Sequence, residues 1–120
     1  MSKTILIAED APMLREMLAL ELREHGLAVE LAKDGKEAIT AIKKKKPALL
    51  LLDLVMPRVD GFAVLQYMHQ KGCTFPVVIL SNLSDPQEEQ RCRDLGAKDF
   101  LIKSQFDAGE LWRKIEQYVE

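Results

Sequence analysis

Short apolar runs alternate with longer amphipathic stretches along the chain. The apolar runs fall at residues 4–8, 27–32, 48–52, 75–80 and 99–102. The intervening stretches carry apolar residues at helical spacing, as at Leu14, Met17, Leu18 and Leu22 near the start and at Leu111, Ile115, Tyr118 and Val119 near the end. A strand followed by a helix, repeated five times, is typical of a parallel sheet covered on both faces. We therefore expect an α/β fold, a doubly wound five-stranded parallel sheet of five βα units.

The expected helix ends carry sequence signals that agree with this alternation. An Asp followed three residues later by a Glu is a capping-box pattern, found at Asp34 and Glu37, Asp85 and Glu88, and Asp107 and Glu110. Proline suits a first helical turn and glycine the left-handed residue after a helix, as at Pro12, Pro86, Gly26, Gly72 and Gly96. The basic run 43–46 is explained in the same way, because cations suit the negative end of a helix.

Composition narrows the possible classes of partner. At 120 residues the chain has the size of one domain, which we expect to span residues 1–120. Its 17 basic and 19 acidic residues give a net charge of −2, which argues against nucleic acid or an anionic membrane as a direct partner. Cys73 and Cys92 have no metal-ligand spacing, and no signal peptide or long apolar span is recognisable, so we expect free thiols and a cytoplasmic location.

The third apolar run raises a chemical question, because it ends in a carboxylate. Residues 49–52 are all leucine, as expected for a central strand buried on both faces, and Asp53 follows directly. A buried carboxylate without a partner is costly. Asp53 therefore needs a cation or another strong partner.

Polar side chains follow four of the five expected strands. Glu9 and Asp10 follow the first strand, Asp53 the third, Ser81 the fourth and Lys103 the fifth. Ligands of open α/β sheets bind beyond the carboxyl ends of the strands, where the strand order reverses. Taken singly, Asp10 is explained as a helix cap and Lys103 as a solvated loop residue. Taken together, the acids would repel one another unless a hard cation joined them, and Mg²⁺ is the natural candidate.

These residues resemble the receiver domain of two-component response regulators, the CheY-like family, along essentially the whole chain. The resemblance rests on Glu9 and Asp10, on the run "DLVMPRVDG" with Asp53, Met56, Pro57 and Gly61 in register, on Ser81 and on Lys103. It implies the flavodoxin-like receiver fold, with strand order 2-1-3-4-5. It also implies a signalling switch that catalyses its own phosphorylation and dephosphorylation and is not a turnover enzyme.

The resemblance implies that Asp53 is the phosphoryl acceptor. The donor would be a phosphohistidine on a sensor histidine kinase or phosphotransfer domain, or a small molecule such as acetyl phosphate. Mg²⁺ would be bound by Asp10, Asp53 and the backbone carbonyl of Val55, with Glu9 acting mostly through a water. Such a transfer depends on positioning and charge neutralisation more than on covalent assistance.

Lys103 and Ser81 would contact phosphoryl oxygens, and Ser81 and Phe100 would form the switch. In the family, the hydroxyl residue moves inward and the aromatic residue follows. Phe100 is equally well explained as a partly buried strand aromatic. Phosphorylation would change the surface made by the fourth helix, the fifth strand and the fifth helix, which would bind a downstream target or a missing output domain, or form a homodimer.

The sequence departs from the family pattern at three places. The hydroxyl residue is Ser81 where threonine is also common. Ser104 follows Lys103 where proline is usual, which puts a cis peptide in doubt. Val55 and Leu83 are apolar at positions that flank the phosphoryl group, and we expect them to slow self-dephosphorylation because they cannot orient a water.

Other interpretations remain open or are disfavoured by single residues. A receiver-like interaction module that is not phosphorylated is the serious alternative. A haloacid-dehalogenase-like phosphatase would need an acid where Val55 stands, and a flavodoxin-type flavin module would need a hydroxyl-rich loop where "EDAPM" stands. Asp60 is interpreted as a polar surface residue.

Overall fold

All five expected strands form, and they pair into one parallel sheet. The computed structural model describes residues 3–82 and 85–119. The strands are β1 (Thr4–Ala8), β2 (Ala28–Ala32), β3 (Leu49–Asp53), β4 (Val77–Ser81) and β5 (Asp99–Ile102). Their order is β2-β1-β3-β4-β5, with every neighbouring pair parallel. The expected fold class and strand order are confirmed.

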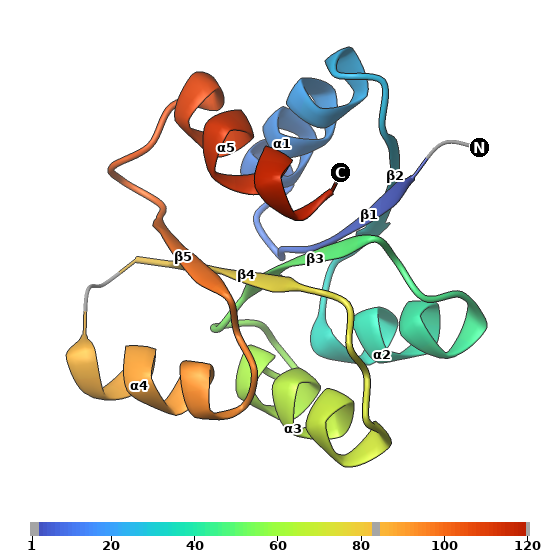
Figure 1. Ribbon diagram of the computed structural model, residues 1–120, viewed down its shortest axis with the longest axis vertical. Helices are drawn as coiled ribbons and strands as arrows, with labels where there is room; N and C mark the ends of the chain where they lie inside the picture. The colour runs from blue at the N-terminus through green and yellow to red at the C-terminus, as the bar shows by residue number, and fades with distance from the viewer. Residues whose placement is uncertain (1–2, 83–84, 120) are drawn as a thin grey trace.

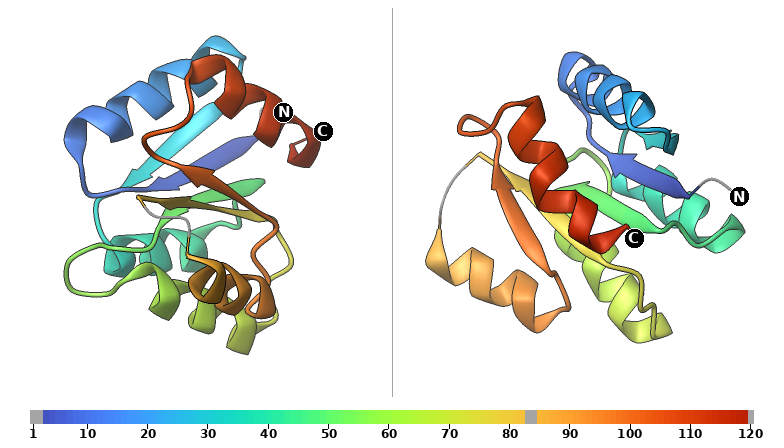
Figure 2. Two further views of the ribbon diagram at one scale, coloured as in Figure 1. Left: turned by 90° about the vertical axis from the view of Figure 1, so that its left-hand side faces the viewer. Right: turned by 45° about the horizontal axis from the view of Figure 1, so that its top comes forward.

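Helices cover both faces of this sheet. They are α1 (Pro12–Glu24), α2 (Gly35–Lys44), α3 (Gly61–Lys71), α4 (Pro86–Asp94) and α5 (Ala108–Ile115), followed by a short 3₁₀ helix, η1 (Glu116–Tyr118). Figures 1 and 2 show α1 and α5 on one face and α2, α3 and α4 on the other. None of the helices in the described residues is long and apolar enough to cross a membrane.

The leucine run of β3 divides the core between the two faces. Leu50 and Leu52 pack in the cluster that α2, α3 and α4 cover, whereas Leu49 and Leu51 pack in the cluster under α1 and α5. All four are fully buried. Side chains of a strand alternate between faces, so an unbroken apolar run is what a strand covered on both sides requires. β3 is therefore the central strand of the sheet, and its apolar side chains are shielded from solvent on both faces.

The helix caps follow the sequence signals closely, with instructive differences. Asp34 and Asp107 each accept a hydrogen bond from the amide three residues later, as expected, but Asp85 bonds to the amide of Gln87 instead of Glu88. Asp60 is exposed, as expected, and in addition its side chain caps α3 by accepting from the amide of Ala63 at 2.9 Å. Ala11 precedes α1, and among the described residues no side chain caps that helix, so Asp10 does not serve as its cap.

Some apolar residues lie where helical spacing alone did not place them. Met17 is exposed, because the buried face of α1 runs through Leu18, Ala19 and Leu22 instead. α5 ends at Ile115 and continues as the 3₁₀ turn, whereas the spacing predicted a helix to the end. The basic run does close α2, with Lys43 and Lys44 in its last turn.

The start of α3 packs against the end of β3. A Cβ added to Gly61 would lie 2.4 Å from the carbonyl oxygen of Asp53. The amide of Gly61 also donates to the carbonyl of Leu54 at 3.0 Å. Only glycine permits this close approach, which fixes the turn that follows Asp53.

Candidate functional site

Three acids converge at the carboxyl ends of β1 and β3. Glu9, Asp10 and Asp53 each present a carboxylate oxygen, and these oxygens lie within 4.8 Å of one another. They meet because β1 and β3 are direct neighbours in register. Glu9 is 0% exposed and Asp53 only 3%, whereas Asp10 is open to solvent. The described residues contain no other group of three acids, histidines or cysteines that could hold a metal ion.

Lys103 brings the balancing positive charge from the far edge of the sheet. Its ammonium lies 2.6 Å from Glu9 Oε1 and 3.1 Å from Asp53 Oδ2, and the side chain is largely buried. Its backbone amide donates to the carbonyl of Ser81 at 2.7 Å, which fixes the start of the loop after β5. All peptide bonds among the described residues are trans, the one between Lys103 and Ser104 included.

Burial and charge change the acidity of both partners in this pair. Burial raises the pKa of Asp53 to about 6, with the neighbouring Glu9 adding to the shift and Lys103 opposing it. Burial alone would lower the pKa of Lys103, but Glu9 and Asp53 outweigh it and raise that pKa above its usual value. One ammonium is therefore too little to neutralise the acids around it.

The donor set fits a hard divalent cation. Among the described residues, the buried side-chain atoms without a hydrogen-bond partner are Glu9 Oε1 and Asp53 Oδ2, both within ion-pair distance of Lys103 alone. Carboxylate oxygens are the ligands that Mg²⁺ prefers, and a cation would supply the missing charge. The amide of Val55 donates to Asp53 Oδ1 at 3.2 Å, so the backbone of Val55 also borders the cluster.

A hollow of about 170 Å³ opens beside the carboxylate of Asp53. Its walls come from the turn after β3, from the start of α3, from the end of β4 and from α4, and they are Asp53, Leu54, Val55, Phe62, Ser81, Asn82 and Glu88. Val55 is 76% exposed and therefore stands at the rim. Leu83, which we expect to flank the same site, lies outside the described residues. The hollow offers a small group access to Asp53.

Ser81 and Phe100 line one small space behind this hollow. Ser81 is almost fully buried at the end of β4, and Phe100 is half-buried on β5. A cavity of about 10 Å³ lies between them and α4, too small to hold a further side chain. The guanidinium of Arg93 lies 5.0 Å from the ring centroid of Phe100. Any inward movement of Phe100 therefore needs Ser81 or α4 to move as well.

Sequence reasoning missed Arg15, a residue of α1 that supports the site. Its guanidinium donates to the carbonyl of Glu9 at 2.9 Å and to that of Asp10 at 3.4 Å. The available signal was a cation in the first turn of a helix, where the dipole disfavours positive charge. Such a residue needs an acceptor nearby, and the strand-end carbonyls supply it.

Comparison with known proteins identifies relatives of the chain. A family model described as "Response regulator receiver domain" matches residues 5–116. Response regulator RR06 of Streptococcus pneumoniae serotype 2 is 41% identical over 99 residues, 82% of this chain and 45% of that protein. Response regulator MprA of Mycobacterium bovis is 38% identical over 103 residues, 86% of this chain and 45% of that protein. The chain thus spans less than half the length of these curated relatives.

A solved structure matches the fold over nearly the whole chain. The receiver domain of the Francisella response regulator 1452 superposes with a TM-score of 0.91 at 26% sequence identity. The match covers 98% of this chain and 97% of that one.

Proposed function

This chain belongs to the response regulator receiver family, and from that membership we propose that it accepts a phosphoryl group on Asp53 in a Mg²⁺-dependent reaction. The observation that carries the proposal is the convergence of Glu9, Asp10 and Asp53 within 4.8 Å, with Lys103 3.1 Å from Asp53. Positioned charge of this kind is the main requirement of phosphoryl transfer.

In the proposed reaction, a carboxylate oxygen of Asp53 attacks the phosphorus of the donor. The bond between phosphorus and the leaving nitrogen or oxygen breaks, its electron pair stays with the leaving group, and an aspartyl phosphate forms. With a pKa of about 6, Asp53 is mostly ionised at neutral pH and can act as the nucleophile. Mg²⁺, held by Asp10, Asp53 and the carbonyl of Val55 with Glu9 assisting through water, would neutralise phosphoryl charge.

Lys103 and Ser81 are proposed to receive the phosphoryl oxygens. Phosphorylation moves the negative charge of Asp53 outward onto the phosphoryl group. Glu9, 2.6 Å from the ammonium, still anchors Lys103, which can then pair with a phosphoryl oxygen. Ser81 borders the same hollow, and its hydroxyl is proposed to donate to another oxygen.

We expect the protein donor to dock along α1. Met13 and Leu20 are 88% and 61% exposed, and with the less exposed Met17 they form an apolar stripe on the helix that begins just after Asp10. A phosphohistidine must come within bonding distance of Asp53, so its carrier must cover the surface beside the site. We propose an apolar helical face of a sensor histidine kinase or phosphotransfer domain as the occupant, in the cytoplasm.

The α1 stripe can be tested separately from the chemistry. Met13→Asp and Leu20→Asp variants should accept phosphate more slowly from a phosphohistidine protein and at the parent rate from acetyl phosphate. Equal rates with both donors would place the docking surface elsewhere.

The output is proposed to pass through Ser81 and Phe100 to α4, β5 and α5. Lys114 of α5 pairs with Asp99 of β5 at 3.2 Å and donates to the carbonyl of Phe100 at 3.2 Å. Tyr118 donates to Asp99 at 3.1 Å, so β5 is tied firmly to the C-terminal helices. A shift of Phe100 would thus change a continuous surface that a downstream target, an output domain or a second copy can bind.

Intact mass spectrometry tests the proposal directly. The chain is incubated with acetyl phosphate in Mg²⁺ or in excess chelator, beside an Asp53→Asn variant. We expect one added phosphoryl group in the parent with Mg²⁺ and none with chelator or in the variant. No mass gain with any donor, including a phosphohistidine protein, would favour a receiver-like interaction module instead.

A further inference from the structure

The loop between β3 and α3, residues 54–60, rests on the beginning of α2. The amide of Gly35 donates to the carbonyl of Val59 at 2.9 Å. A Cβ added to Gly35 would lie 2.0 Å from that same oxygen, far inside any real contact. Only glycine therefore permits this approach, and the loop and α2 are fixed to each other at one point.

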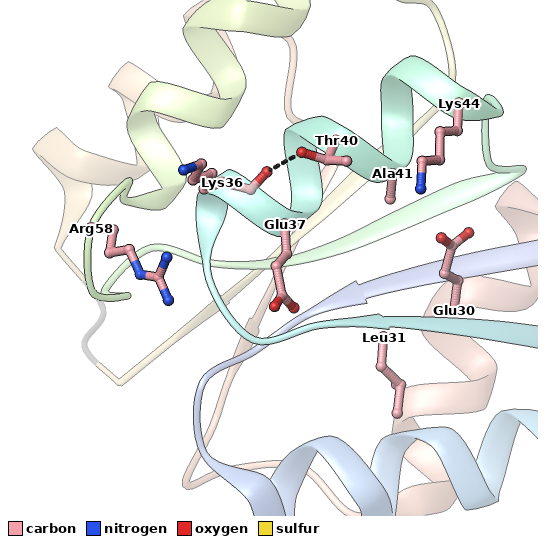
Figure 3. A pocket seen from close by; sticks show the side chains of 8 residues that line it. All are labelled: Glu30, Leu31, Lys36, Glu37, Thr40, Ala41, Lys44 and Arg58. Atoms are coloured by element: carbon pink, nitrogen blue, oxygen red, sulfur yellow. Dashed lines mark hydrogen bonds between the residues drawn. The ribbon is translucent and has the colours of Figure 1, made fainter.

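A buried carboxylate adds a second attachment beside the first. Asp34, 2% exposed, caps α2 by accepting from the amide of Glu37 at 2.8 Å. Its other oxygen lies 3.4 Å from Nε of Arg58 in the loop. Figure 3 shows the Arg58 side chain reaching from the loop toward the hollow between α2 and β2, where Glu37 also points. The ion pair therefore joins the loop to the start of α2, the helix end at which Gly35 contacts the loop.

The backbone at Arg58 needs such an attachment. Among the described residues it is the one non-glycine residue with a positive φ, at 65°. An L-residue rarely holds this conformation unless the surroundings enforce it. The amide of Val59 donates to the carbonyl of Pro57 at 2.9 Å, which closes a tight turn around Arg58, and the ion pair with Asp34 adds a side-chain contact.

The opposite end of the loop is fixed to the site itself. Gly61 donates to the carbonyl of Leu54, and Val55 donates to Asp53 Oδ1. Val55 therefore lies on a short segment held at one end by β3 and α3 and at the other by α2. The orientation of its backbone depends on both ends.

We propose that Asp34 and Arg58 are positioning residues of the metal site, which hold the loop so that the carbonyl of Val55 is presented beside Asp53. The proposal rests on the proposed function, since it needs that site to bind Mg²⁺. Neither side chain is among the three acids of the cluster, so neither is expected to contact the metal, and positioning would act through the loop backbone.

Isothermal titration with Mg²⁺ on the full chain tests this role without any phosphoryl donor. Asp34→Asn keeps an oxygen that can cap α2 but removes the charge pair, and Arg58→Gln removes the pair from the other side. We expect each variant to weaken Mg²⁺ binding by about three- to tenfold, and the double variant by no more than the stronger single one.

The direction of the Arg58 effect separates positioning from simple electrostatics. Loss of a positive charge near an acidic site should strengthen cation binding or leave it unchanged, and Lys36→Gln, in the same hollow but outside the pair, is the control for that effect. Weaker binding by Arg58→Gln with no loss by Lys36→Gln supports the proposal. Unchanged Mg²⁺ affinity in both Asp34→Asn and Arg58→Gln, even with a lower melting temperature, would overturn it. Failure of the parent chain to bind Mg²⁺ would instead overturn the proposed function.

Discussion

Asp53 sits at the end of a dry strand, and its buried carboxylate has Lys103 as its only cationic partner among the described residues. Glu9 competes for the same ammonium at shorter range. The result is a carboxyl group whose pKa is raised to about 6, by burial first and by Glu9 second. In the roles proposed for it, as nucleophile and metal ligand, Asp53 would be sensitive to both protons and cations.

That sensitivity predicts how Mg²⁺ affinity depends on pH. Below a pH of about 6 Asp53 binds a proton that the metal must displace, so the apparent affinity should fall by up to about tenfold per pH unit there. At higher pH the carboxylate is ionised and the affinity should level off. Titration calorimetry between about pH 5 and 8 measures this profile.

The α3 cap supplies the matched control for the pH profile. Asp60→Asn also removes a carboxylate near the site in sequence, yet it retains an oxygen that can cap the helix. We expect the parent profile in this variant. A Mg²⁺ affinity of the parent chain that does not change with pH would contradict the raised pKa of Asp53.

Val55 leads to a prediction about the lifetime of the phosphorylated form. Its side chain is exposed at the rim of the hollow and carries no group that could orient an attacking water. Val55→Asn should therefore accelerate loss of the phosphoryl group severalfold, as followed by intact mass after donor removal. Leu20→Asn places the same polar side chain on the exposed face of α1 and is the control, so its phosphorylated form should decay at the parent rate. Equal decay rates for the parent, Val55→Asn and Leu20→Asn would contradict this role of Val55.

At the scale of single residues, the sequence indicated which side chains form the candidate site but not which ones support them. Glu9, Asp10, Asp53 and Lys103 were identifiable because each follows an apolar run, and the structure brings them together. The pairing of Arg58 with Asp34 was not identifiable from the sequence, because it joins two loops that approach each other only in the folded structure.

At the scale of elements, two glycines near helix starts differ in whether the packing leaves room for a Cβ. Gly35 opens α2 with no room for a Cβ, whereas a Cβ on Gly109, near the start of α5, would meet its nearest atom at an ordinary 3.4 Å. Gly35→Ala should lower the free energy of unfolding by about 2 kcal/mol or more. Gly109→Ala should raise it by about 0.5–1 kcal/mol, because alanine costs less backbone entropy in a helix.

Urea denaturation of both variants measures these changes. The two substitutions add the same methyl group near a helix start, so a difference in sign isolates the contact with Val59. Similar stability for both variants would mean that the loop can move away from α2 at little cost.

Elements were predictable where local chemistry decides them. The strands and most helix starts follow from apolar runs and from capping residues such as Asp34 and Asp107. The end of α5 and the exposure of Met17 were not, because both depend on which face of a helix meets the sheet. That choice is made by tertiary packing, which spacing alone does not specify.

For the whole molecule, the alternation of strands and helices was sufficient to predict a doubly wound parallel sheet. The strand order came from the resemblance to receiver domains, because more than one order satisfies the same alternation. The order places β1 beside β3 and so assembles the acids. The curated relatives are more than twice as long as the matched segment.

The central claim is that this assembled site directs a phosphoryl group to Asp53. Treating the phosphorylated chain with borohydride converts an aspartyl phosphate to homoserine, which peptide mass mapping locates. We predict homoserine at position 53 alone, and only after incubation with donor and Mg²⁺. Homoserine at another aspartate, or none in a chain that has gained a phosphoryl group, would contradict the account.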